Sequence, residues 1–141
     1  MTIEAALRAY LAAQSAITDV VGRNIYVDTA PQEIAPPYII IELSQQQPEY
    51  HMGGEASVHM SMLSVRYVGQ GRLEPEQYKS SRDLSLIVRP FLSGFQGLWD
   101  TMQVSSCMIG NETPTVEPPL NGQEMGPASY THDLKVWHAG E

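Results

Sequence analysis

Hydrophobic residues recur at helical spacing over the first dozen positions of the chain. Thr2 can cap this helix, and Glu4 lies in its first turn, where the helix dipole favours an anion. The residues that share the apolar face are Ile3, Ala6, Leu7, Tyr10 and Leu11. A second, short helix is predicted from Ser15 to Val21, with Gly22 as its stop.

Two strands are predicted in the next part of the chain. The first is brief and covers Ile25 to Val27. A proline-bearing loop follows, and the second strand should begin after Pro37 because proline cannot donate to a sheet ladder. Tyr38 to Leu43 is rich in β-branched residues, which is typical of a largely buried strand.

A long third strand is predicted from Ala56 to Val68. Near its end one face is apolar, while the earlier positions of the same face are polar. The apolar positions are Leu63, Val65 and Tyr67, and the polar ones are Ser57, His59 and Ser61. This change of character predicts an arm that leaves the core halfway along the strand.

One further helix is predicted after the third strand. Glu74-Pro75-Glu76 is typical of a helix start, and Pro90 should end or kink the helix. Its apolar positions are Tyr78, Leu84, Ile87, Val88 and Phe91, and the small residues Ser80 and Ser81 can sit against the sheet.

The last two strands are predicted from Met102 to Ile109 and from Tyr130 to His138. In the final strand apolar residues alternate with polar ones, which is typical of a half-buried strand. The apolar row is Tyr130, Leu134 and Val136.

The order of elements predicts a single α+β domain over residues 1–141. We expect an antiparallel or mixed sheet with two main helices packed on one face. Two long polar segments, residues 45–55 and 111–127, interrupt this pattern. Loops of this length in a compact domain are usually functional or disordered, so each is either a loop or a protruding hairpin arm.

Composition excludes several classes of protein. The chain has 141 residues, 43% of them hydrophobic, with 8 basic and 16 acidic residues for a formal net charge of -8. Such a chain can build a core, but it repels a phosphate backbone, and its basic residues are not clustered. No apolar run approaches the roughly 20 residues that cross a bilayer, and the N-terminus lacks the pattern of a secretory signal. We expect a soluble protein made in the cytoplasm.

No catalytic, cofactor-binding or metal-binding residue is predicted. The four histidines, His51, His59, His132 and His138, lack metal-site spacing, and we expect them at the surface or at strand rims. Cys107 lies in an alternating strand and is expected to be a small buried hydrophobe. The glycines near position 70 lack the residues of a phosphate loop.

Three methionines lie on or near the third strand. They are Met52, Met60 and Met62, and the last two face away from the row that contains Leu63 and Val65. Methionine suits both a core and an adaptable interface, so both interpretations stay open.

Several short segments of the first third resemble the opening of tail terminator, or tail completion, proteins of long-tailed bacteriophages and prophages. These segments are Ile3 to Leu11, Val20 to Tyr26, Ala30-Pro31, and Pro36 to Ile39. The later order of a long strand, a helix and C-terminal strands is similar in layout. Segment 111–127 departs from that layout.

The resemblance implies a structural protein of the virion tail, without enzymatic activity or cofactors. Such proteins form a ring, typically hexameric, that caps the tail tube and joins it to the connector proteins of the head. DNA would pass through without specific binding, and the chain would wait in the host cytoplasm before assembly. The alternatives are another head–tail joining or minor tail protein, or a small-ligand binding domain.

Overall fold

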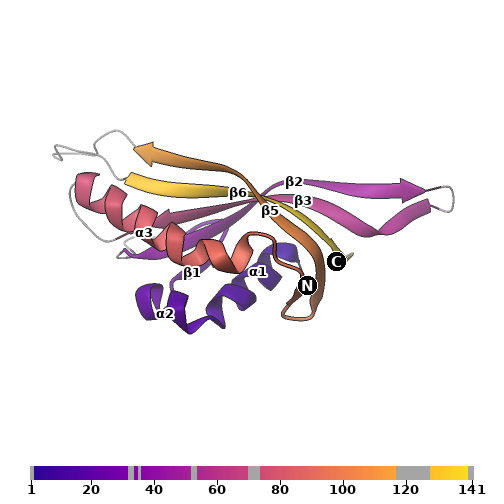
Figure 1. Cartoon of the computed structure of the whole chain (residues 1–141), viewed down its shortest axis with the longest axis horizontal. Helices are drawn as coiled ribbons and strands as arrows, with labels where there is room; N and C mark the ends of the chain where they lie inside the picture. Colours follow the sequence, from indigo (N-terminus) through magenta and orange to yellow (C-terminus); the bar gives the residue numbers. More distant parts are fainter. Residues whose placement is uncertain are drawn as a thin grey trace.

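The computed structural model describes residues 2–31, 34, 36–51, 54–69, 74–116 and 128–139. Three helices and six strands lie within these ranges (Figure 1). The helices are α1 (Ile3–Ala12), α2 (Ser15–Val21) and α3 (Glu74–Leu92). The strands are β1 (Ile25–Val27), β2 (Tyr38–His51), β3 (Gly54–Val68), β4 (Gly97–Trp99), β5 (Met102–Val116) and β6 (Ala128–Ala139).

The strands form one sheet with the order β1-β2-β3-β6-β5-β4. β1 and β2 pair in parallel, and all other neighbours are antiparallel. The α+β class is therefore confirmed, and the sheet is mixed. Figure 1 shows a curled, strongly twisted sheet, with the helices gathered on one side of it.

Local sequence explains the first two helices. The Thr2 hydroxyl oxygen accepts a hydrogen bond from the backbone N–H of Ala5 at 3.2 Å, so the predicted cap is present. Gly22 ends α2 with φ +61, a conformation that glycine adopts without a Cβ clash.

Helix α3 continues past Pro90, where the sequence predicted either an end or a kink. The helix runs on to Leu92, and the N–H of Ser93 still donates to the carbonyl of Arg89 at 2.9 Å. Pro90 has no N–H to donate to the Leu86 carbonyl, and the helix ends two residues later, at Leu92.

The hydrophobic core lies between the helices and one face of the sheet. Three neighbouring strands contribute the alternating residues Ile39 and Ile41, Leu63 and Val65, and Leu134 and Val136, while α1 contributes Ile3, Leu7 and Leu11. These are the rows that period-two and helical spacing predicted. The side chain of Trp99, from the short strand β4, is also fully buried.

Several predicted boundaries are wrong. Within segment 45–55, residues 45–51 belong to β2 and residues 54–55 to β3, so they are strand and not loop, while residues 52–53 lie outside the described residues. β5 extends to Val116 and so includes part of segment 111–127, whose remainder lies outside the described residues. In both cases cross-strand pairing outweighs the weak strand propensity of the polar residues.

Strand β4 was missed altogether. It pairs with the start of β5, and the turn between Trp99 and Met102 contains Asp100, whose positive φ of +56 suits a tight hairpin. Gly97 begins β4 with φ +142, a backbone conformation that favours glycine.

Candidate assembly surfaces

The far end of the β2–β3 hairpin extends beyond the rest of the sheet. β3 pairs with β6 only as far as Val58, opposite Ala139, whereas β2 and β3 continue to the His51–Gly54 pair. Residues 48–51 and 54–57, here called the distal hairpin, therefore have only each other as strand neighbours within the described chain. Figure 1 shows this ribbon pointing away from the helices. A two-stranded ribbon is marginally stable alone in water, so this geometry favours a partner surface.

Both ends of the sheet present long strand edges. β1 covers only Ile39 to Ile41 of β2, and β4 covers only Met102 to Val104 of β5. Beyond Cys107, which exchanges backbone hydrogen bonds with Gly94 and Phe95, no described strand pairs with the outer side of β5. Unpaired edges of this kind are templates for strand addition by another chain.

The exposed edges of β2 and β5 also contain prolines and bulges, which limit non-specific pairing with other strands. β2 contains Pro48 and β5 contains Pro114, neither of which has an N–H to donate. Register shifts occur between Leu43 and Gln45 and between Ile109 and Glu112. Prolines and bulges of this sort restrict which partner strand can add to an edge.

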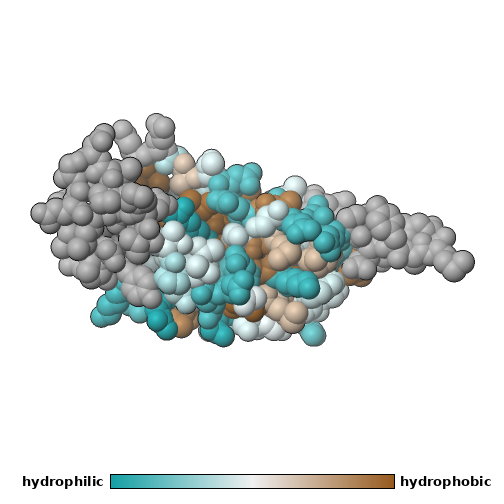
Figure 2. All heavy atoms as spheres, turned by 90° about the horizontal axis from the view of Figure 1, so that it is seen from above, coloured by the Kyte–Doolittle hydropathy of each residue, from teal (hydrophilic) through white to brown (hydrophobic). Residues whose placement is uncertain are grey.

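The sheet face opposite the helices is open and mixed in character. Met62, Lys135 and Met108 lie side by side across β3, β6 and β5, and the two methionines are 36% and 47% exposed. In the next row Trp137 is half-buried, with Nζ of Lys135 5.1 Å from its ring centroid. Figure 2 looks onto this face and shows hydrophobic patches among hydrophilic side chains. Met62 is thus a surface residue, while Met60 beside it is only 7% exposed.

A polar network on the helical side joins four elements, with its inner residues Tyr67 and His132 buried and its outer residues Glu112 and Arg89 partly exposed. The hydroxyl of Tyr67 lies 2.9 Å from Nδ1 of His132, and Nε2 of His132 lies 3.2 Å from Oε1 of Glu112. The Nη1 of Arg89, on α3, donates to the same Glu112 oxygen at 2.7 Å. The contact between His132 and Glu112 lacks the geometry of a hydrogen bond. The Glu112 carboxylate therefore acts on the buried Nε2 through its negative charge.

Burial determines the protonation of this network. Removal from water lowers the pKa of His132 below its ordinary value of 6.5, although the Glu112 carboxylate acts to raise it. Burial also raises the pKa of Tyr67 well above 10.0. A neutral His132 accepts the Tyr67 proton at Nδ1 and presents Nε2–H to Glu112.

A second buried pair consists of Ser61 and His138. The Ser61 Oγ lies 2.6 Å from Nε2 of His138, whose Nδ1 lies 2.6 Å from the carbonyl oxygen of Ala139. This resembles a serine–histidine pair, but both side chains are 0% exposed. A nucleophile needs access to substrate, so this arrangement acts as a structural hydrogen-bond chain between β3 and β6.

The remaining candidate chemistry is also buried. Cys107 is fully buried, as predicted, and burial raises its pKa to about 12. No group of three or more histidine, cysteine or carboxylate residues within the described ranges is arranged to hold a metal ion. No helix in the same ranges is long and apolar enough to span a membrane.

The positions of the histidines differ from the sequence prediction. The expectation of surface or rim histidines is wrong for His132 and His138, which are both fully buried. The signal was present, because both occupy the same alternating row as Leu134 and Val136. No spacing along the chain indicates that Glu112 lies beside His132 or that Arg89 binds Glu112. The side chain of His51 lies outside the described residues.

The fold is similar to that of a solved virion protein. A chain of the structure "Virion of native gene transfer agent (GTA) particle" superimposes with a TM-score of 0.65 over 98% of this chain and 95% of that chain, at 15% identity. At this identity the likeness shows a shared fold. No curated protein matches the chain.

Sequence comparison identifies the family. Residues 5–78, just over half of the chain, match the family described as tail completion protein gp17. The chain therefore belongs to this family, and the resemblance expected from the N-terminal segments is confirmed. It is a structural protein of phage-like tails.

Proposed function

We propose that the chain is a tail terminator that forms a homo-oligomeric ring at the head-proximal end of the tail tube. The ring stops tube growth and offers a second surface to the head-completion, or connector, protein. Residues 1–141 act as one tail-terminator-like domain, and six copies close the ring, as the family resemblance implies. Membership of the tail completion family is the observation that carries this proposal.

The sheet edges support a ring rather than a two-fold dimer. The open edges belong to β2 and β5, which lie toward opposite ends of the strand order. A contact between different surfaces on successive copies is heterologous, and such contacts generate rings when the rotation closes. The distal hairpin, acting as an arm, is suited to reach the neighbouring copy because it extends beyond β6.

The charge of the chain is compatible with a DNA passage. With a net charge of -8, the protein repels phosphate overall, and its 8 basic residues are not clustered along the sequence as non-specific DNA binding would favour. DNA therefore passes without being held. The chain resides in the host cytoplasm until it joins the tail, and its role needs no catalytic residue, cofactor or metal.

Co-assembly with tail tube protein tests this proposal. Tube protein of the same particle is polymerised with and without the purified chain, and the tubes are measured by electron microscopy. We expect shorter tubes that carry density for the added chain at one end. Tubes of unchanged length without end density would instead assign the chain to another head–tail joining or minor tail role.

A further inference from the structure

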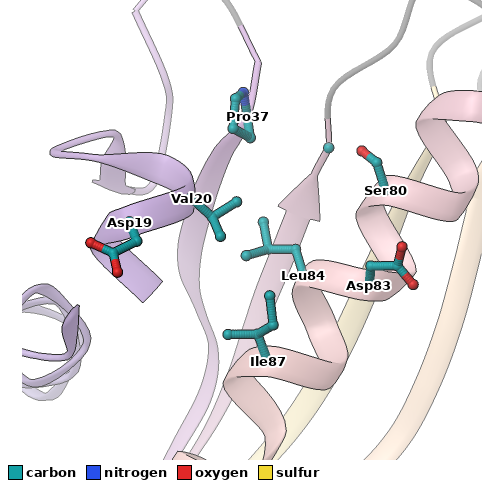
Figure 3. Close-up of a pocket in the computed structure, with 8 residues that line it drawn as sticks. Asp19, Val20, Pro37, Ser80, Asp83, Leu84 and Ile87 are labelled. Carbon is teal, nitrogen blue, oxygen red and sulfur yellow. The ribbon is translucent and has the colours of Figure 1, made fainter. Parts of the chain in front are cut away.

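A groove runs between helices α2 and α3, on the side of the molecule away from the open sheet face (Figure 3). Its volume is about 330 Å³. Val20 from α2 and Leu84 and Ile87 from α3 form its apolar floor, and Figure 3 shows these three side chains directed toward one another. Pro37 and Gly69, at the ends of β2 and β3, close one end of the groove.

The floor is held in place by the core. Leu84 is 2% exposed, so the groove is part of the packed structure, whereas Val20 is 40% exposed and free to contact a partner. Ser81 fixes α3 to the sheet, because its hydroxyl accepts the Gly69 N–H at 2.9 Å and donates to the Ala128 carbonyl at 3.3 Å. Gly69 is required at this close approach, since a Cβ there would collide with Ser80.

Two carboxylates flank the apolar floor. Asp19 projects from α2 and Asp83 from α3, and both are exposed. Neither side chain forms a hydrogen bond or ion pair with the described residues, and Lys79, one turn before Asp83, forms no ion pair with it. An apolar floor between unpaired acids is complementary to an apolar side chain flanked by cations.

We propose that the α2–α3 groove binds a short protein segment in which an apolar anchor residue is flanked by lysine or arginine. The segment belongs to a different protein of the assembled particle, so the choice of partner rests on the proposed function. A second copy of this chain is not needed at the groove, because the ring contacts proposed above use the β2 and β5 edges and the distal hairpin. The apolar anchor provides burial, and the two carboxylates select for positive flanks.

Binding of a defined peptide tests the groove. The probe is a synthetic peptide with two leucines flanked by lysines, titrated into the isotope-labelled full chain and followed by NMR chemical shifts. We expect the largest shifts at Asp19, Val20 and Ile87, and weaker binding as salt is raised from about 0.05 M to about 0.3 M. A control peptide with glutamates in place of the lysines should not bind.

Substitutions in the groove sharpen the test. The double variant Asp19→Asn, Asp83→Asn should weaken binding roughly two- to fivefold per charge removed, as expected for exposed ion pairs. Val20→Ser should weaken it as well. Matched controls are Glu42→Gln on the open sheet face and Leu98→Ser, whose side chain is 56% exposed on β4. Both controls should bind the peptide like the unaltered chain.

Several results would overturn the inference. These are no shifts at the groove up to about 1 mM peptide, equal binding of the glutamate peptide, or undiminished binding by the aspartate double variant. Shifts at the groove on raising protein concentration without peptide would assign it to a second copy. Native mass spectrometry separates the groove proposal from the ring proposal. The aspartate double variant should still form the ring. If the unaltered chain binds the peptide but never forms a ring, only the ring is refuted.

Discussion

The Tyr67 hydroxyl lies 2.9 Å from Nδ1 of His132, and both side chains are fully buried between the sheet and α3. The two residues are diagonal neighbours on adjacent strands, because His132 pairs with Val65 and Tyr67 pairs with Tyr130. They are the innermost part of the network that continues through Glu112 to Arg89 on the helix. This network ties α3 to the part of β5 that ends in a free edge.

The first prediction concerns the Tyr67 hydroxyl. Tyr67→Phe leaves Nδ1 of His132 buried without a partner, and the free energy of unfolding should fall by about 1–3 kcal/mol. Urea denaturation at neutral pH measures the change. Tyr26→Phe is the matched control, because its hydroxyl bonds the Asn24 side chain at 3.0 Å in a half-buried position and its loss should cost less. Equal costs for the two variants would mean that the buried network adds nothing.

The second prediction concerns pH. The pKa of His132 is lower in the folded chain than its ordinary value of 6.5, so the unfolded chain binds more protons between these two values. The contribution of a neutral His132 is complete above about 6.5 and is lost as pH falls toward the folded pKa. Asp133, Glu112 and Arg89 act on the same imidazole, but burial dominates.

NMR titration of the His132 ring measures this pKa directly, and urea midpoints at about pH 7.5 and about pH 5 measure its effect on stability. Because the folded chain binds this proton more weakly than the unfolded chain does, the urea midpoint should be lower at the lower pH. His132→Gln should reduce the pH dependence. A His132 ring that titrates above its ordinary pKa of 6.5 would contradict the burial-dominated account.

Sequence patterns predicted the strands and helices that have a regular hydrophobic period. They did not predict the segments whose structure depends on pairing with a distant strand. Leu63, Val65 and Val136 were placed in the core because one buried sheet face forces a period of two. The polar residues 45–47 lack strand propensity, and only their pairing with residues 60–62 makes them part of β2. In the same way, nothing local links Arg89 to Glu112 or Glu112 to His132, since these contacts depend on how α3 crosses β5 and β6.

The third prediction concerns Cys107. Burial raises its pKa to about 12, so little thiolate forms near neutral pH and reagents have no access to the sulfur. The native chain should react with a thiol-labelling reagent about a hundredfold more slowly than the urea-unfolded chain. Mass spectrometry over time measures the labelling rate of Cys107 in each state. Equally fast labelling in both states would mean that β5 opens readily around Cys107.

The fourth prediction concerns the distal hairpin. Replacement of residues 49–58 by Asn-Gly keeps the pairing between Pro48 and His59 and removes the ribbon beyond β6. Because no core residue is removed, the variant should stay folded by circular dichroism and should run as a monomer on gel filtration. A matched control alters the other end of the molecule, where Leu86→Ser changes an exposed residue of α3. A shortened chain that still forms rings would exclude the hairpin from the subunit contact.

Native mass spectrometry and negative-stain electron microscopy of the purified chain, alone and with tail tube protein, measure whether the ring forms. Heterologous contacts between β2 and β5 edges and the distal hairpin should give one closed species, with six copies expected, and caps at tube ends when tube protein is present. A strict monomer under both conditions would contradict the account.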